Sequence, residues 1–203
     1  MPMAMPFTSR DLDAFPDDGK RYEIIDGELY VSGHPNYYHQ LVCGNVAYAL
    51  WSWNRLAGAG IAVIAPGIIF GEYDDVVADV IWISRGRLAY ALGPEGHLHL
   101  APEVVAEVIE PGHASEGRDR GLKLDLYSRR GVREYWIVDR RERQVEVYRR
   151  KDAQLQLAAI AIEGDLLDSP LLPRFSCDVR ELFVGIPVRS ELGQEHSHEG
   201  PTH

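Results

Sequence analysis

The chain has 203 residues, of which 45% are hydrophobic and 26% charged, and its net charge is −10. This length suits one domain with a well-filled core, and the composition is typical of soluble globular proteins. No apolar run approaches the roughly 20 residues that span a bilayer, and residues 1–10 lack the pattern of a secretory signal. The cysteines, Cys43 and Cys177, are too few for a zinc site, so we expect two free thiols in a cytoplasmic protein.

The acidic net charge argues against a nucleic-acid partner, but the charge is unevenly distributed. Residues 118–150 hold 11 Lys and Arg against six Asp and Glu, whereas the rest of the chain holds 10 against 25. A basic segment on an acidic body can face a phosphate backbone. It can equally be the solvated face of a helix and a hairpin, and on charge alone this second interpretation is the stronger.

The N-terminal part of the chain predicts a short helix and a hairpin. Residues 1–7 are expected to be disordered, and Thr8 and Ser9 are N-caps for a helix over residues 10–14. Residues 22–31 predict two short strands around Asp26-Gly27, a strong hairpin signal.

A long helix and three strand-like runs follow. Apolar side chains at helical spacing predict a helix over residues 37–56, which Gly58 and Gly60 end. The strand-like runs cover residues 61–65, 67–70 and 76–83, and residues 85–100 predict a loop or a broken helix.

The C-terminal half predicts a central strand, a second helix and further strands. The strands are expected at residues 103–109, 133–139, 144–149 and 154–162, the helix at 115–130 before Gly131, and a helical turn near 179–183. Because strands alternate with two clear helices and hairpins are common, we expect an α/β (α+β) fold with a mixed sheet. The domain is expected to cover residues 8–190, with a disordered polar tail at 191–203.

Two of the predicted strands each carry a single carboxylate on an apolar face. Side chains alternate between faces, so Glu107 lies on the face of Val105 and Ile109. By the same rule Asp79 lies on the face of Ile81 within residues 76–83. A buried lone charge is costly, and two such strands side by side bring two carboxylates together. Hard oxygen ligands favour Mg²⁺ or Mn²⁺, although either residue alone fits a salt bridge at a strand end.

A lysine follows Glu107 by 16 positions on the second predicted helix. Leu122, Leu126 and Tyr127 form its apolar stripe, and Lys123 borders that stripe. Such a lysine can reach toward a neighbouring site and offset charge on an attacked phosphate. By itself the position is that of an ordinary surface residue.

Several segments together resemble the Uma-two family of endonucleases, which belongs to the PD-(D/E)xK, or restriction-endonuclease-like, superfamily. The resemblance covers about residues 7–182 and rests on PEVVAEVIEP, RDRGLK, LY, GVREYWIVD and the early YEIIDGE. It implies a restriction-endonuclease-like core with an N-terminal hairpin, a nuclease activity directed at DNA, and Mg²⁺ or Mn²⁺ as cofactor. One departure is Ala78, where the family usually has a proline that shapes the backbone.

The resemblance also implies site residues. Asp79 matches the first metal-binding aspartate and Glu107 the acidic residue of the (D/E)xK element, with the carbonyl of Val108 as a further ligand. In the (D/E)xK element a lysine follows the acidic residue by two positions, but here that position is Ile109. The family resembles a variant of this element in which the lysine lies on the following helix, and Lys123 occupies that place. Three assignments complete the set: Glu23 as a catalytic and metal-binding carboxylate, His39 as a recurrent family histidine, and Arg118 and Arg120, with His39, in substrate binding.

Two other functions fit the same residues. A binding module can keep the fold without cutting, which the acidic net charge favours. A hydrolase of small phosphates or nucleotides needs the same metal chemistry, and weak salt dependence of substrate binding would identify it. A homodimer through the hairpin at residues 22–31 is expected from analogy with other nucleases of the fold.

Overall fold

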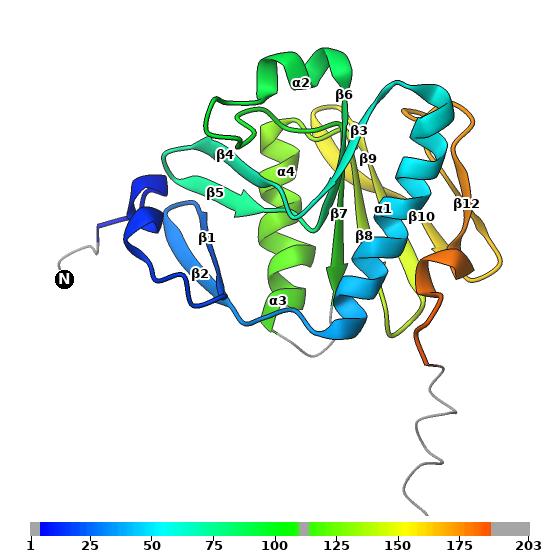
Figure 1. Cartoon of the computed structure of the whole chain (residues 1–203), viewed down its shortest axis with the longest axis horizontal. Coiled ribbons are helices and arrows are strands. Elements are labelled where there is room, and N and C mark those ends of the chain that lie inside the picture. The colour runs from blue at the N-terminus through cyan, green and yellow to red at the C-terminus, as the bar shows by residue number, and fades with distance from the viewer. Residues whose placement is uncertain (1–4, 110–113, 188–203) are drawn as a thin grey trace, which may run out of the picture.

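A six-stranded mixed sheet forms the centre of the molecule (Figure 1). The computed structural model describes residues 5–109 and 114–187. The strand order is β10-β9-β8-β7-β6-β3, and within these residues only β7 and β8 run parallel. Its strands are β3 (Gly60–Ile64), β6 (Val80–Ser84), β7 (Val104–Ile109), β8 (Glu134–Asp139), β9 (Gln144–Lys151) and β10 (Gln154–Ile162). The predicted mixed α/β architecture is confirmed.

A second, antiparallel sheet contains the predicted N-terminal hairpin. Its order is β2-β1-β5-β4, with β1 (Arg21–Ile25), β2 (Glu28–Ser32), β4 (Gly67–Gly71) and β5 (Asp74–Val77). The hairpin turns at Asp26 and Gly27, whose φ angles of 52° and 76° match a tight two-residue turn. The short helix η1 (Ser9–Ala14) precedes it, and Phe7 N donates to Gly27 O at 2.8 Å. The other residues predicted to be disordered, 1–4 and 191–203, lie outside the described residues.

Helix α1 (Tyr37–Ala57) covers one face of the six-stranded sheet. Its buried residues, Val42, Val46 and Leu50 among them, pack on the apolar side chains that β6, β7 and β8 direct to that face. Gly58 ends the helix in the left-handed conformation, as expected. On the same face, β11 (Leu166–Asp168), β12 (Ser176–Asp178) and η3 (Val179–Phe183) contribute apolar side chains to this core, and β11 and β12 were not predicted. The short helix α2 (Arg85–Ala91) packs into the core on the other face.

The opposite face is covered by the helical crossover between β7 and β8 and by the smaller sheet. The crossover consists of α3 (Ala114–Gly117), η2 (Arg118–Leu122) and α4 (Lys123–Arg130). The helix predicted here is confirmed, but η2 is a turn of π-helix, in which Lys123 N bonds to Arg118 O. Single π turns within α-helices are frequent at functional sites.

The continuous strand predicted over residues 76–83 is wrong. The chain leaves the smaller sheet after Val77 and enters the larger one at Val80, so β5 and β6 belong to different sheets. At the crossing, Ala78 N bonds to Pro66 O at 3.3 Å and Ala65 N bonds to Asp79 O at 2.9 Å. Asp79 therefore lies between the two sheets, immediately before β6.

Gly131 ends α4 in the left-handed region with φ 90°, and a Cβ there would meet no atom within 4 Å. Gly131→Ala therefore costs only the conformational strain, and we expect the free energy of unfolding to fall by about 1–2 kcal/mol. Urea denaturation measures this change. A loss of well under 0.5 kcal/mol would show that this backbone conformation is not needed to end the helix.

No helix in the described part of the chain is both long and apolar enough to cross a lipid bilayer.

Candidate active site

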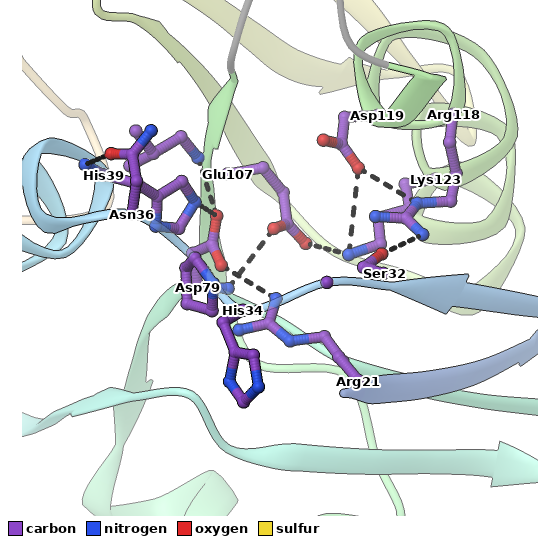
Figure 2. A pocket seen from close by; sticks show the side chains of 13 residues that line it. Arg21, Ser32, His34, Asn36, His39, Asp79, Glu107, Arg118, Asp119 and Lys123 are labelled. Carbon is purple, nitrogen blue, oxygen red and sulfur yellow. Dashed lines mark hydrogen bonds and ion pairs between the residues drawn. The ribbon is translucent and has the colours of Figure 1, made fainter. Parts of the chain in front are cut away.

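A cavity of about 320 Å³ opens where the two sheets, the start of α1 and the π turn meet (Figure 2). Its polar lining combines carboxylates with cationic and imidazole side chains: Arg21, His34, His39, Asp79, Glu107, Arg118, Asp119 and Lys123. Five of the side chains expected in the site from the sequence, Asp79, Glu107, Lys123, His39 and Arg118, are thereby brought together.

Asp79 and Glu107 are neighbours because of the register between β6 and β7. Val80 pairs with Ala106, so Asp79, one residue earlier, lies beside Glu107. Asp79 N donates to Glu107 Oε2 at 3.3 Å, and Val108 N donates to Asp79 Oδ2 at 2.9 Å. Both side chains are almost fully buried. The predicted pairing of the two carboxylates is therefore present, and backbone amides orient both.

Asp79 has two further partners. Arg21 Nη1 donates to its Oδ1 at 2.9 Å, and His39 Nε2 lies 3.1 Å from its Oδ2. Burial favours the neutral acid, but the hydrogen bond with His39 and the charges of His39, Arg21 and Lys123 outweigh it and lower the pKa of Asp79. Asp79 is therefore a carboxylate at neutral pH.

Lys123 is completely buried, contrary to the surface position that its place beside the apolar stripe indicates. Leu122, which the pattern placed on that stripe, is 37% exposed instead. The Lys123 ammonium lies 2.9 Å from Glu107 Oε1, 3.0 Å from Glu23 Oε1 and 3.8 Å from Asp119 Oδ1. Its charge thus compensates three buried carboxyl groups.

Glu107 is harder to ionise than an ordinary carboxyl group. Burial raises its pKa, and nearby Asp79 and Asp119 add to the rise, which Lys123 opposes; the result is a pKa of about 8. Three permanent cations (Arg21, Arg118 and Lys123) face four carboxyl groups (Glu23, Asp79, Glu107 and Asp119). A protonated His39 balances the fourth carboxylate, and a neutral His39 leaves one excess negative charge when all four are ionised. A proton on Glu107, or an added cation, removes that excess.

The donor set fits a divalent cation. Among the described residues, Asp79 Oδ1 accepts from Arg21 alone and Glu107 Oε2 accepts from Asp79 N alone. A carboxylate oxygen has two lone-pair positions, so each of these oxygens can still bind a cation. Hard carboxylate oxygens suit Mg²⁺ and Mn²⁺. Asp79 and Glu107 are therefore the residues here that could hold one.

Glu23 and Arg118 form an ion pair next to Lys123. Glu23 is fully buried and contacts Lys123, Arg118 Nη1 at 3.3 Å and Val77 N at 3.0 Å. Burial opposes its ionisation, but Lys123, Arg118 and Arg21 lower the pKa of Glu23. These contacts favour a role in positioning Lys123, whereas direct binding of a metal by Glu23 stays a prediction.

Arg120 is not among the residues that line the cavity. It contacts Glu146, Asp139 (3.2 Å) and Glu116 (3.3 Å) at the other side of the π turn. Its predicted role in substrate binding has no support from this placement, because three carboxylates already surround its guanidinium.

Sequence reasoning missed three residues of the cluster. Asp119 and Tyr127 stand four residues before and after Lys123, and Tyr127 Oη donates to Glu107 Oε1 at 2.7 Å. That helical spacing around Lys123 was a usable signal. Arg21 had no comparable signal, because its partner Asp79 is 58 residues away.

The basic segment at residues 118–150 is largely neutralised by ion pairs. Arg129 pairs with Asp26, Arg130 with Asp74, Arg143 with Glu163 and Arg149 with Asp168. The interpretation of this segment as a broad basic surface is therefore weakened, and cations near the cavity are the better candidates for phosphate contacts.

Known proteins resemble this chain in both sequence and fold. The model of the Uma2 family, described as "Putative restriction endonuclease", matches residues 9–180. A crystal structure described as "a putative nuclease belonging to DUF820", from Anabaena variabilis ATCC 29413, superposes with a TM-score of 0.71 at 18% identity, covering 88% of this chain and 98% of that one. No curated protein matches. Because the family match spans most of the sequence, the chain belongs to the Uma-two family of restriction-endonuclease-like proteins.

Proposed function

We propose that this protein is a metal-dependent endonuclease that hydrolyses phosphodiester bonds in DNA. The observation that carries the proposal is the adjacency of buried Asp79 and Glu107, with Lys123 2.9 Å from Glu107, at the wall of an open cavity. The family to which the chain belongs is described as "Putative restriction endonuclease", which favours DNA as the substrate. The cytoplasmic location and the homodimer stay predictions.

Each residue of the site has its own role in the proposed reaction. Asp79 and Glu107 would hold Mg²⁺ or Mn²⁺, and such a cation supplies Lewis acidity toward the phosphate and lowers the pKa of the attacking water. Lys123 neutralises Glu107 and directs a fixed positive charge toward the site, where it stabilises negative charge that develops on the phosphate. Arg118, at the cavity wall, offers a second cation to a substrate phosphate. Glu23 keeps Lys123 charged and in place.

The direct test incubates the purified protein with supercoiled plasmid and with single-stranded DNA, in Mg²⁺, in Mn²⁺ and in EDTA. We expect nicked and linear plasmid with either metal and intact plasmid in EDTA. A folded protein that binds metal and DNA but never cuts would instead identify the binding module. Cleavage of small phosphodiesters alone, with little effect of salt on binding, would identify a small-substrate hydrolase.

Metal affinity should rise with pH. A cation needs Glu107 in its ionised form, and the pKa of Glu107 in the metal-free site is about 8. Below that pH, metal binding must displace the Glu107 proton, and this step alone should increase affinity about tenfold per pH unit between pH 6 and 8 and level off above. Calorimetric titration with Mn²⁺ in buffers of different ionisation enthalpy counts the released proton. An affinity that is constant between pH 6 and 8 would show that Glu107 is not a ligand.

A further inference from the structure

His39 is fixed at the start of helix α1, directly beside Asp79. Asn36 caps this helix, and its side-chain oxygen accepts from His39 N at 2.9 Å. Residues of the first helical turn point back toward the N-terminus of the helix, which here faces the cavity. The His39 side chain is only 11% exposed and is directed at the Asp79 carboxylate (Figure 2). Helix capping therefore places an imidazole at the same wall as the two carboxylates.

The spacing between His39 and Asp79 suits two ligands of one cation. His39 Nε2 lies 3.1 Å from Asp79 Oδ2. Two ligand atoms that bind one cation at right angles, each at about 2.1 Å, lie about 3.0 Å apart. Without its proton, His39 Nε2 no longer donates to Asp79 Oδ2, which then accepts, within the described residues, from Val108 N alone and keeps a lone-pair position for a cation. The pair could therefore bind one cation with little movement of either side chain.

Cys43 contacts the other nitrogen of His39. His39, Cys43 and Asp79 form the one set of three potential ligand residues, among those described, whose donor atoms all lie within 4.8 Å of one another. Burial raises the pKa of the Cys43 thiol, and Asp79 and Glu107 raise it further, so the sulfur stays protonated and is a poor ligand. Its Sγ lies 3.5 Å from His39 Nδ1, where it helps to orient the ring and leaves Nε2 toward Asp79.

We propose that His39 Nε2 is a ligand of the divalent cation that Asp79 and Glu107 hold, and that this nitrogen makes the site prefer Mn²⁺ to Mg²⁺. The inference rests on the proposed metal-dependent function and replaces the substrate-binding role predicted for His39. Mg²⁺ strongly favours oxygen ligands, whereas Mn²⁺ accepts imidazole nitrogen as well. A ligand set of one imidazole and two carboxylates therefore discriminates between two cations that carboxylates alone bind similarly.

Pulsed electron paramagnetic resonance of bound Mn²⁺ tests the nitrogen ligand directly. The full-length wild-type protein, saturated with Mn²⁺, should show coupling to a ¹⁴N nucleus that changes to a ¹⁵N pattern when the histidines are ¹⁵N-labelled. His39→Asn should lose this coupling, and His34→Ala should keep it, although His34 lines the same cavity. The labelled wild type gives the answer even if the His39 variant is unstable.

Calorimetry provides a second readout that needs no cleavage. We expect the wild type to bind Mn²⁺ at least about tenfold more tightly than Mg²⁺, and His39→Asn to reduce this ratio severalfold because an amide oxygen replaces the imidazole. Mn²⁺ bound without nitrogen coupling, together with loss of binding in Asp79→Asn, would overturn the role of His39 and leave the proposed function intact. A wild type that binds neither cation would overturn both.

Discussion

Lys123→Met is expected to lower the free energy of unfolding by about 3–5 kcal/mol and to abolish cleavage. The variant keeps most of the side-chain volume but removes the charge that lies between Glu23, Glu107 and Asp119. Removing one partner of a buried ion pair leaves an uncompensated buried charge, which is costly on this scale. Chemical denaturation measures the stability, and the plasmid assay measures the activity.

The pH dependence identifies the cause of this loss. Without Lys123 the buried carboxyl groups have pKa values raised above those of the unfolded chain, so folding takes up protons and stability falls as pH rises. The difference between wild type and variant should therefore be smaller at pH 5 than at pH 8. Lys151→Met removes an exposed lysine and should change stability by less than about 0.5 kcal/mol. An equally mild effect of Lys123→Met would contradict the burial of its charge.

Glu107→Gln is expected to reduce cleavage at least about 100-fold while changing the free energy of unfolding by less than about 1 kcal/mol at pH 7. With a pKa of about 8, Glu107 is largely protonated in the metal-free protein at that pH, so a neutral amide is a mild replacement. The amide oxygen can still accept from Lys123 and Tyr127. It is a poor ligand for a hard cation, so the transition-state stabilisation that the cation supplies is lost.

Glu134→Gln is the matched control for this variant. Glu134 is also fully buried, lies on the adjacent strand β8 at the end remote from Glu107, and accepts from Trp136 and Ser169. This variant should cut DNA at the rate of the wild type. If both glutamine variants lose activity equally, loss of a buried carboxylate anywhere in the sheet explains the result, and no special role of Glu107 remains.

The alternation along β7 was sufficient to predict the environment of Glu107. Val105 and Ile109 lie in one core cluster, Val104 and Val108 in the other, and Glu107 faces the same side as the former pair. A period of two is a local property of the extended chain, so it survives folding unchanged. The break before β6 could not be predicted in this way, because it depends on hydrogen bonds with Pro66 and Ala65 in another strand connection.

The burial of Lys123 shows the limit of periodicity on a helix. A regular period of 3.6 residues places Lys123 at the border of the apolar face, whereas the π turn before it inserts an extra residue into that turn. Arg118 and Lys123 then both line the cavity, and Leu122 turns toward solvent. The ion pairs that stabilise the buried Lys123 are made with Glu23 on β1 and Glu107 on β7. The sequence pattern of the helix alone cannot indicate them.

Cleavage of supercoiled plasmid by the wild type, Asp79→Asn and Glu134→Gln, each with Mg²⁺, Mn²⁺ or EDTA, tests the central claim most directly. Asp79 contacts Arg21, His39 and Val108 at the cavity wall, whereas Glu134 lies in the same sheet outside the site. We predict that the wild type and Glu134→Gln cut with either metal, that Asp79→Asn does not cut, and that EDTA stops all cutting. Wild-type rates in Asp79→Asn, or cutting by the wild type in EDTA, would contradict a metal-dependent nuclease centred on Asp79 and Glu107.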